Sequence, residues 1–556
     1  MNEKNAVKPC VVGVDFGSLS ARALIVEAAT GRELASAVME YPHGVMSEAL
    51  PDGTPLKPDW ALEHPADYLE CLRTVIPEAI RRAGVPASDV VGLGIDVTAC
   101  TVLPVDADNE PLCFKSEYAG VPHAWMMLWK HHAAQEFANR MTRVADGRSE
   151  RFLERYGGKV SSEWLFPRLW QVLEEAPEIY AAADRFIDAA DWLVQKLTGS
   201  DVRAAGIAGY KYFWHKAEGY PSEDYFAALD KRLRHVVRDK LRGEVRPIGS
   251  RGGRLTAAGA AMTGLLPGTA VAVGNIDAHV SMPSTGRVEA GDYLMIIGTS
   301  SCHMFVDREE RAIPGICGRV EDGIIPGLFG YEAGQSCVGD SFAWFVERCC
   351  PASARAAAEA AGVGLHEWLT ERAARLRPGQ SGLLALDWWN GNRSVLVDAD
   401  LTGLILGLNL STQPEEIYRA LIESTAYGAR TIVDNFERHG AKVRRMFACG
   451  GIAKKNPFLM QVYADVLNRE IRVVSSNQSG ALGAAVFGSV AAELYPTVAD
   501  AAAAMGGVDA RVYAPIPENA AVYDALYREY VRLHDLFGRG GCDAMKRLKQ
   551  IRDRQA

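Results

Sequence analysis

The sequence predicts an α/β protein made of two related domains that face each other across a cleft. Its 556 residues exceed what a single hydrophobic core usually supports. Short β-prone runs alternate with helical stretches along the chain. A hairpin with a small, hydroxyl-rich turn occurs once in each half. We therefore expect an N-terminal domain over residues 10–286 and a C-terminal domain over residues 287–556, with the boundary near Gly286.

The first half opens with three short β-prone runs at residues 11–14, 23–28 and 34–39. Small turns separate them, which predicts a meander of hairpins. A helix is expected at about residues 65–82. The nearly continuous apolar run 90–97 follows, and such a run is typical of a strand buried on both faces.

Residues 270–277 predict one further apolar strand, which ends in Gly274-Asn275-Ile276-Asp277. A polar group at the end of a buried strand is where α/β folds place their chemistry. Asp277 is therefore a candidate for catalysis, although an Asp at a strand end is usually a cap.

The second half repeats the order of the first. Runs 292–297 and 303–306 flank the turn 298–301, much as the first hairpin flanks residues 15–20. A strong helix is expected at 415–438, and a strand at 445–449 follows it. The final stretch, 518–556, is expected to be helical, without a functional interpretation.

Composition narrows the class of protein. Of the residues, 48% are apolar and 23% are charged, which is typical of a soluble globular enzyme. The net charge of -9 argues against nucleic acid as a partner. No segment has the length and apolar character of a membrane span or a leader. The 11 cysteines lack metal-ligand spacing and fit a reducing cytoplasm.

The first chemical motif runs from Val14 to Arg22 and contains Asp15, Gly17 and Ser18. Glycine and small hydroxyl residues let backbone N–H groups approach phosphate oxygens. A carboxylate at a strand end can hold Mg²⁺, usually through its waters. The same Asp-x-Gly-Ser pattern is also a common tight turn, so the motif alone leaves both interpretations open.

Two further loops have the same character. The second hairpin turn contains Gly298, Thr299 and Ser300. The third loop follows the strand at 445–449, and its glycine pair permits a close approach of backbone. In the third loop Asn456 is expected to cap a helix, whose N-terminus would carry partial positive charge. Each loop also fits an ordinary hairpin or the entry to a helix. The candidate residues of the third loop are Gly450, Gly451, Lys454 and Asn456.

Taken in order, the three loops resemble the two phosphate loops and the adenosine loop of the FGGY family of carbohydrate kinases. The resemblance covers about residues 10–490 and includes segment 403–408 and the small-residue helix at 479–485. It implies two actin-like ATPase (ribonuclease H-like) domains with a nucleotide and sugar cleft between them. It also implies ATP as the phosphoryl donor, with Mg²⁺. In that case Asp277 matches the catalytic aspartate of the family, and Asp15 would position the metal.

Several segments resemble the members of this family that act on ribulose. The Trp-x-Asp-x-Arg pattern of xylulose-specific members is missing from residues 125–132. By resemblance, Ala99, Lys211 and Glu332 would bind the sugar beside Asp277, although Lys211 and Glu332 could each form a surface salt bridge instead. Whether the Trp pairs at 125/129 and 388/389 line a pocket or a core stays open. The other matching segments are 161–164, 208–211, 330–336 and 387–393.

The resemblance thus implies ATP-dependent phosphorylation of L-ribulose, and of D-ribulose, to ribulose 5-phosphate in pentose or arabinose breakdown. Another pentulose or pentitol, such as xylulose or ribitol, is the alternative substrate. A nucleotide-driven chaperone or filament protein of the same fold is a rival, but it would not need Asp277 with Lys211 and Glu332. The expected partners are the sugar and ATP, and a homodimer is compatible with the sequence.

Overall fold

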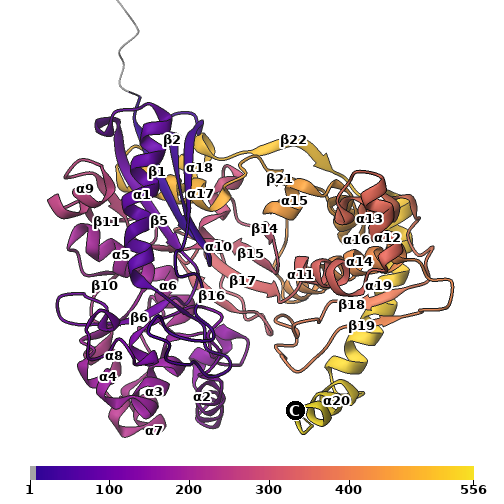
Figure 1. The fold of residues 1–556 in the computed structure, drawn as a ribbon, viewed down its shortest axis with the longest axis horizontal. Helices are drawn as coiled ribbons and strands as arrows, with labels where there is room; N and C mark the ends of the chain where they lie inside the picture. The colour runs from indigo at the N-terminus through magenta and orange to yellow at the C-terminus, as the bar shows by residue number, and fades with distance from the viewer. Residues whose placement is uncertain (1–7, 556) are drawn as a thin grey trace, which may run out of the picture.

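The computed structural model describes residues 8–555, which form two lobes (Figure 1). The first lobe is built on a seven-stranded sheet of order β11-β12-β5-β1-β2-β3, with β13 also paired to β5. In this sheet β1 and β2 are antiparallel, whereas β1 and β5 are parallel. The strands are β1 (Cys10–Phe16), β2 (Ser20–Glu27), β3 (Glu33–Glu40), β5 (Val90–Val97), β11 (Arg251–Arg254), β12 (Ala270–Ala272) and β13 (Asn275–Ile276).

The predicted meander, helix and buried strand of the first half are confirmed. β5 covers the predicted residues, and its side chains are almost all buried, as expected of a strand covered on both faces. Helix α1 (Pro65–Ala83) begins where His64 accepts a hydrogen bond from the Ala66 backbone N–H. It ends at Gly84, whose φ of 66° is the left-handed conformation that suits glycine.

The single strand predicted at 270–277 is wrong. β12 ends at Ala272, β13 holds only Asn275 and Ile276, and Asp277 begins the short helix α10 (Asp277–Val280). The break falls at Gly274, where a Cβ would lie 2.7 Å from the Cβ of Ala190. The close approach of the helix that carries Ala190, α5 (Ala189–Thr198), displaces the backbone from the sheet at this point. Asp277 nevertheless follows directly on the last paired residue.

The lower part of the first lobe covers one end of this sheet (Figure 1). It contains a four-stranded sheet of order β4-β7-β6-β8. These strands are β4 (Leu62–Glu63), β7 (Met126–Met127), β6 (Val102–Val105) and β8 (Arg185–Asp188). The helices of this part are α2 (Gln135–Gly147), α3 (Leu165–Glu175), α4 (Pro177–Ala182), α6 (Ala205–Lys211), α7 (Glu223–Leu229) and α8 (Val236–Lys240). Helix α9 (Ala257–Thr263) lies higher, against α1 and beside β11 (Figure 1).

The second lobe repeats the arrangement of the first. Its sheet has the order β16-β17-β15-β14-β20-β21-β22, in which β14 and β15 are antiparallel and β14 and β20 are parallel. The two sheets are therefore built on the same hairpin and parallel strand, as predicted. The strands are β14 (Asp292–Ile297), β15 (Ser301–Asp307), β16 (Gly318–Glu321), β17 (Phe329–Gln335), β20 (Arg445–Cys449), β21 (Ile471–Val474) and β22 (Val508–Tyr513).

Helices cover the sheet of the second lobe. The predicted helix at 415–438 is α14 (Pro414–Arg438), which begins with a capping box between Gln413 and Glu416. A small sheet of β18 (Leu384–Leu386) and β19 (Leu404–Leu406) lies beside it. The other helices are α11 (Gly339–Trp344), α12 (Ala352–Ala360), α13 (Leu365–Arg375), α15 (Gly451–Lys455) and α16 (Pro457–Leu467).

Two helices late in the chain return to the first lobe. Both contribute to the core of the first lobe: α17 (Ser479–Ala491) packs on β1 and β5, and α18 (Val498–Met505) packs against α17 (Figure 1). Glycines permit the contact, because a Cβ at Gly13 would lie 1.8 Å from the Ala481 carbonyl oxygen, and a Cβ at Gly94 would lie 1.8 Å from that of Ala484. Residues 479–505 follow the predicted domain boundary near Gly286 in the chain, but they pack on the first lobe.

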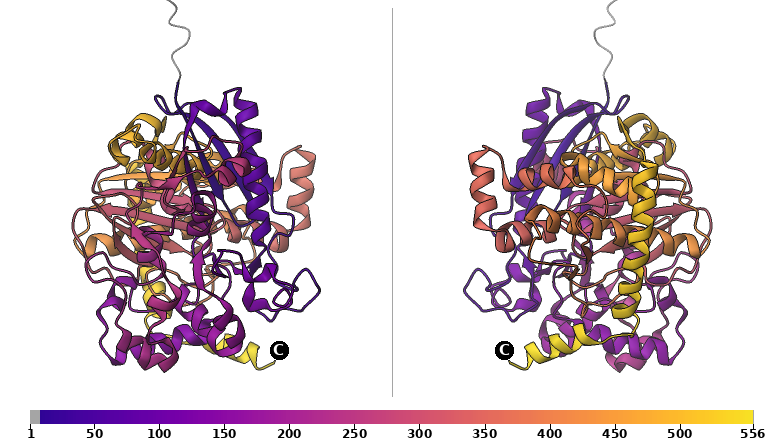
Figure 2. Two further views of the ribbon diagram at one scale, coloured as in Figure 1. Left: turned by 90° about the vertical axis from the view of Figure 1, so that its left-hand side faces the viewer. Right: turned by 90° about the vertical axis from the view of Figure 1, so that its right-hand side faces the viewer.

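The C-terminal stretch is helical over most of its length, as predicted. α19 (Pro517–Gly538) runs along the outer face of the second lobe and is followed by α20 (Ala544–Asp553) (Figure 2). Tyr523, Tyr527 and Tyr530 share one buried face of α19, at the spacing of one side of a helix. Residue 556, which the prediction also covered, lies outside the described residues. Among residues 8–555, no helix combines the length and apolar character that a membrane crossing requires.

Candidate active site

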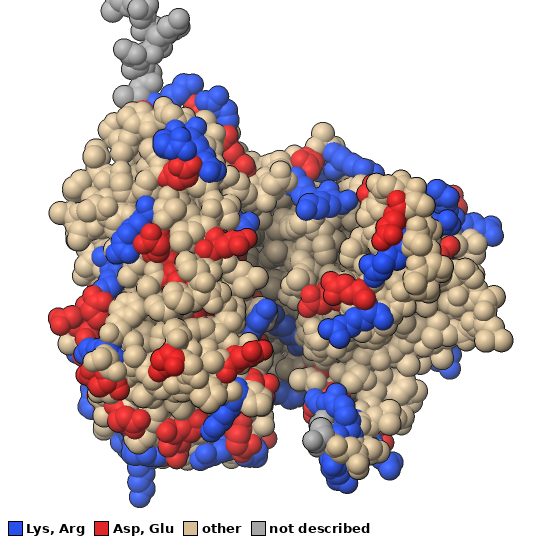
Figure 3. All heavy atoms as spheres, viewed as in Figure 1, with Lys and Arg blue, Asp and Glu red and all other residues tan. Residues whose placement is uncertain are grey.

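The strand ends of the first lobe bring three carboxyl groups together. Asp15 is the second-last residue of β1 and lies opposite Asp96 on β5, and Asn275 of β13 lies opposite Asp96 on its other side. Asp277 follows two residues later. Because these strands are parallel, their carboxyl ends meet at one edge of the sheet. This edge faces the hollow between the lobes that Figure 3 shows.

The surroundings of these carboxyl groups oppose their ionisation. Loss of water raises the pKa of Asp277 to about 7, and the nearby charge of Asp15 adds to the effect. The fully buried Asp96 has a pKa raised well above its usual value, by burial first and then by Asp15 and Asp277. Burial also raises the pKa of Asp15, against the attraction of Arg22, whose Nε lies 3.6 Å from Asp15 Oδ2.

The first predicted phosphate loop is a tight turn between β1 and β2. Gly17 N–H donates to the Ser20 carbonyl oxygen at 3.0 Å, and Tyr41 donates to the Gly17 carbonyl oxygen at 2.8 Å. Ser18 Oγ accepts a hydrogen bond from Trp129 Nε1 at 3.0 Å. Trp129 is thus partly buried against this loop and attaches the segment 125–132 to it. Trp125, by contrast, is buried in the core.

The second and third predicted loops lie side by side in the second lobe. Their strands β14 and β20 are neighbours, and a Cβ at Gly450 would lie only 2.5 Å from the Ile297 carbonyl oxygen. Gly298 N–H donates to the Ser300 carbonyl oxygen at 2.9 Å, and the Thr299 carbonyl oxygen accepts from Val338 N–H at 2.8 Å. The second and third loops are thus in direct contact where β14 and β20 end.

Asn456 and Lys454 have different surroundings. Asn456 caps α16, where its Oδ1 accepts from Leu459 N–H at 3.0 Å, as predicted. Lys454 Nζ donates to the Ser475 carbonyl oxygen at 2.8 Å and pairs with Asp509 at 2.9 Å. Its ammonium group is therefore already engaged by protein partners.

Lys211 and Glu332 form one buried ion pair that joins the lobes. Lys211 ends α6 in the first lobe and Glu332 lies in β17 of the second, with Nζ and Oε2 3.0 Å apart. The surface salt bridge considered from the sequence is thus wrong for both, since their side chains are 1% and 5% exposed. Two further side chains reach Glu332, with His279 Nε2 at 3.0 Å and Arg393 Nη2 at 3.2 Å.

These partners decide the charge of Glu332. Burial alone would raise its pKa, but Lys211, His279 and Arg393 hold the pKa well below its usual range. Glu332 in turn raises the pKa of Lys211 against the opposing effect of burial. Both groups therefore stay ionised inside the protein, close enough to Asp277 to affect its pKa.

Family comparisons match the chain in two consecutive parts. Residues 10–282 match the N-terminal domain of the FGGY family of carbohydrate kinases, and residues 293–492 match its C-terminal domain. The chain belongs to this family. The resemblance drawn from the three loops is thereby confirmed.

Individual relatives of this FGGY kinase extend over the whole chain. A ribulokinase of Geobacillus thermodenitrificans is 56% identical over 551 residues, 98% of this chain and 98% of that one. A ribulokinase of Anoxybacillus flavithermus is 55% identical over 551 residues, with the same coverage. Among solved structures, the xylulose kinase of Rhodospirillum rubrum has a TM-score of 0.77 at 24% identity and covers 94% of this chain and 98% of that chain. The actin-like, two-domain fold is thus confirmed.

Arg168 is a supporting residue of this FGGY kinase that was not predicted from the sequence. It lies in α3 and is fully buried, and its guanidinium donates to the carbonyl oxygens of Cys100, Met127 at 3.1 Å and Leu128 at 2.8 Å. It thereby holds the loop of the predicted sugar residue Ala99 against the segment 125–132. The sequence contains a signal for this role, because an Arg within the apolar run 165–173 must find hydrogen-bond partners inside the protein.

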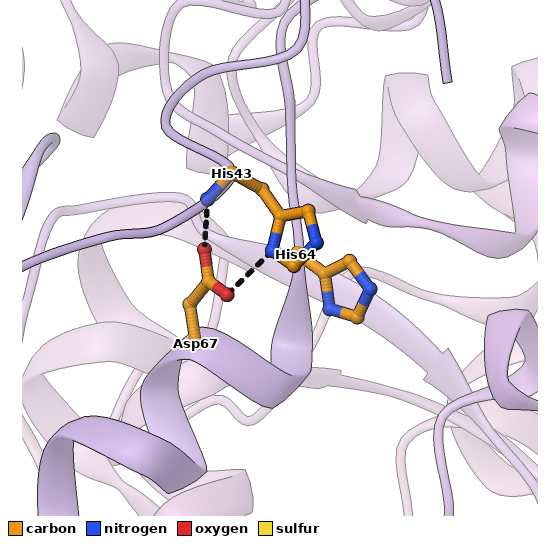
Figure 4. Close-up of side chains that lie close together, drawn as sticks. All are labelled: His43, His64 and Asp67. Carbon is orange, nitrogen blue, oxygen red and sulfur yellow. Dashed lines mark hydrogen bonds and ion pairs between the residues drawn. The ribbon is translucent and has the colours of Figure 1, made fainter. Parts of the chain in front are cut away.

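A second cluster of possible metal ligands lies at the start of α1, where His43, His64 and Asp67 meet (Figure 4). The two imidazole rings are stacked, 4.1 Å apart and 20° from parallel. The lone pairs of imidazole nitrogens lie in the plane of the ring. Because the two ring planes are nearly parallel and separated, one ion cannot lie in both planes at about 2.0 Å from a nitrogen of each ring. Asp67 instead accepts hydrogen bonds from the backbone N–H of His43 at 3.1 Å and from its ring at 2.7 Å. This cluster fastens the chain before α1.

Proposed function

We propose that this FGGY kinase transfers the γ-phosphoryl group of ATP to the 5-hydroxyl of ribulose, L-ribulose first and D-ribulose second. The products would be ADP and ribulose 5-phosphate. The observation that carries the proposal is the position of Asp277, at the strand edge and near the buried Lys211–Glu332 pair. The substrate class rests on the relatives that are named ribulokinase and are 56% and 55% identical.

Asp277 would act as the general base. Its carboxylate accepts the proton of the sugar hydroxyl while the hydroxyl oxygen forms its bond to phosphorus and the bond from phosphorus to ADP breaks. The proton then leaves to solvent when the products are released. A pKa of about 7 suits this task, because about half of such groups are ionised at neutral pH and the ionised form is basic enough to take a proton.

Lys211, Glu332 and Ala99 would line the sugar site. Lys211 donates and Glu332 accepts, so together they complement sugar hydroxyls, which do both. A substrate that lacked one of these hydroxyls would leave a buried charge with a lost partner, which discriminates strongly. Glycerol should accordingly be a poor substrate.

Asp15 would position Mg²⁺ on the ATP side of the site. The residues fit a hard cation, because the carboxylate of Asp15 lies beside Asp96, whose two oxygens receive no hydrogen bond from the described residues. When bound, Mg²⁺ would neutralise charge on the phosphate oxygens. The nucleotide would lie against Gly17, Ser18, Gly298, Thr299, Ser300, Gly450 and Gly451, with Lys454 and Asn456 at the edge of the adenosine side.

The two halves of the chain would serve different parts of the reaction. We place the sugar residues Ala99 and Lys211, with Asp15 and Asp277, in the domain 10–286. The domain 287–556 would supply the sugar residue Glu332, the second phosphate loop and the adenosine loop, apart from residues 479–505, which pack on the first lobe. ATP as the donor supports action in the cytoplasm.

A coupled assay of ADP release tests the substrate. Purified protein with Mg²⁺ and ATP is compared by kcat/KM across L-ribulose, D-ribulose, L-xylulose, D-xylulose, ribitol and glycerol. We expect L-ribulose to be turned over best, and ribitol and glycerol poorly. A preference for xylulose, ribitol or glycerol would overturn the substrate, and an absence of any sugar-dependent ADP release would overturn the kinase reaction as well.

A further inference from the structure

Asp96 is the most deeply buried carboxyl group of the site. Its residue is 0% exposed, and neither carboxylate oxygen receives a hydrogen bond from the residues that the structure describes. It stands between Asp15 and Asn275 in the sheet, opposite both in register. A buried carboxylate without a donor is unfavourable, and a second carboxylate beside it makes the arrangement worse. A pair such as Asp15 and Asp96 is stabilised by a bound cation or by a proton shared between the two carboxyl groups.

A second buried polar atom beside Asp96 also has no hydrogen-bond partner among the described residues. It is Nδ2 of Asn275, the residue opposite Asp96 in the sheet. The first turn of α17 reaches Asp15, since a Cβ at Gly480 would lie 2.8 Å from Asp15 Oδ2. Polar side chains of β1, β5 and β13 thus lie side by side, with the first turn of α17 against Asp15. A hydrated ion would bind some of these acceptor atoms directly. Its waters would form hydrogen bonds with the remaining donors and acceptors.

We propose that Asp96 is a second carboxylate of the divalent-cation site, shared with Asp15, and that Asn275 holds waters of the ion. This rests on the proposed function only in assigning Asp15 to Mg²⁺. Carboxylate oxygens and waters are the ligands that Mg²⁺ and Mn²⁺ prefer. Two carboxylates on adjacent parallel strands place the ion on the floor of the first lobe. The phosphate tail of the nucleotide then meets it when the lobes approach each other.

Binding of Mn²⁺ tests the assignment without any turnover. The free Mn²⁺ signal in electron paramagnetic resonance is titrated with wild-type protein, with and without ADP, and then with Asp96→Asn and Asp15→Asn. We expect both substitutions to weaken Mn²⁺ binding by about 10-fold or more, the scale on which lost supporting ligands reduce metal affinity. Asp191→Asn is the matched control, because Asp191 is also a buried carboxyl group but lies in α5. Its Mn²⁺ affinity should equal that of the wild type.

Each other outcome decides against the inference. If Asp96→Asn binds Mn²⁺ as the wild type does while Asp15→Asn does not, the ion belongs to Asp15 alone and Asp96 holds only a proton. If the wild type binds no Mn²⁺ beyond what ADP binds by itself, both carboxylates are excluded. Should Asp96→Asn fail to fold, wild-type crystals with Mn²⁺ and ADP answer the question by anomalous scattering. We expect the ion within one water of Asp96, and an ion farther away overturns the proposal.

The ribulose assay separates this inference from the proposed function. A wild-type protein that binds Mn²⁺ through Asp96 but releases no ADP with any sugar would keep the cation site and lose the kinase reaction. If the protein phosphorylates ribulose but the Asp96→Asn variant binds Mn²⁺ as tightly as the wild type, the kinase reaction stands and the cation site at Asp96 is lost.

Discussion

Asp277 is subject to two opposing demands. Its position at the floor of the site raises the pKa to about 7, because the carboxyl group loses water and faces Asp15. A general base must nevertheless be ionised when the sugar binds. The proposed sugar ligands have no such conflict, since Glu332 is kept ionised by Lys211, His279 and Arg393. The site therefore contains one carboxylate poised to exchange a proton and one that only binds.

Replacing the base should separate binding from chemistry. In Asp277→Asn the fold and the nucleotide affinity should be retained, while kcat falls by on the order of 10² to 10⁴, the range for loss of a general base. Rapid-quench turnover and calorimetric binding of an ATP analogue measure the two effects. Near wild-type turnover in this variant would remove Asp277 from the mechanism.

The raised pKa of Asp277 also predicts opposite responses of activity and stability to pH. Activity should rise with pH through about 7 and then level off, because only the ionised form accepts a proton. Stability should fall as pH rises from about 4 to about 7, since the folded protein holds this proton more tightly than the unfolded chain does. Asp277→Asn should therefore have a higher Tm than the wild type at pH 8, with a difference that shrinks toward pH 4. Equal Tm differences at both pH values would mean that Asp277 has an ordinary pKa.

At the scale of elements, α17 connects the two halves of the chain. It leaves the second lobe after β21 and packs on β1 and β5, which end at Asp15 and Asp96. Glycines on both sides make the contact possible, including Gly483, where a Cβ would lie 1.7 Å from the Val280 carbonyl oxygen. The helix supports the strands that carry the carboxyl groups and places its first turn against Asp15.

A methyl group in this contact should be costly. Gly94→Ala would place a Cβ against the backbone of Ala484, which cannot move without shifting α17. We expect a loss of stability at or above the upper end of the 1–3 kcal/mol range typical of overpacking, measured by urea unfolding. Gly147→Ala, near the end of α2, is the control, because nothing lies within 4 Å of its Cβ. It should be neutral or slightly stabilising, and comparable losses in both variants would show that the tight contact with α17 is not the cause.

At the scale of the whole molecule, the two phosphate loops belong to different lobes. Gly17 and Ser18 lie in the first lobe, and Gly298 to Ser300 lie in the second, across the hollow of Figure 3. The lobes are already joined by the buried Lys211–Glu332 pair. Both loops can hold one nucleotide only if the lobes approach each other, with that junction staying in place. The homodimer that the sequence allows stays a prediction.

Closure should be visible in solution. Small-angle scattering should give a smaller radius of gyration when ribulose and a non-hydrolysable ATP analogue are both present than with either alone. The physical reason is that, under the proposed function, each ligand would contact residues of both lobes and be buried by their approach. An unchanged radius of gyration, with binding of both ligands verified by calorimetry, would contradict the prediction.

Local sequence determined the regular elements and the loops between them. The hairpin turns at Gly17 and Gly298, the strands β5 and β20 and the helix α14 follow from side-chain periodicity, turn residues and caps, which act over a few neighbouring positions. Resemblance to a family then pointed to Asp15, Asp277, Lys211 and Glu332. The strand at 270–277 was mispredicted because a close contact with α5, far away in sequence, interrupts it.

Only the tertiary structure decided which charges are buried and with what partners. The sequence places Asp96 at the end of the predicted buried strand 90–97, but its lack of hydrogen-bond donors depends on strands β1 and β13 on either side. Arg168, Arg393 and the return of α17 to the first lobe likewise depend on segments that are distant along the chain. Burial and electrostatic energy are properties of the assembled neighbourhood. A sequence can therefore name the residues of a site before it can state their charge.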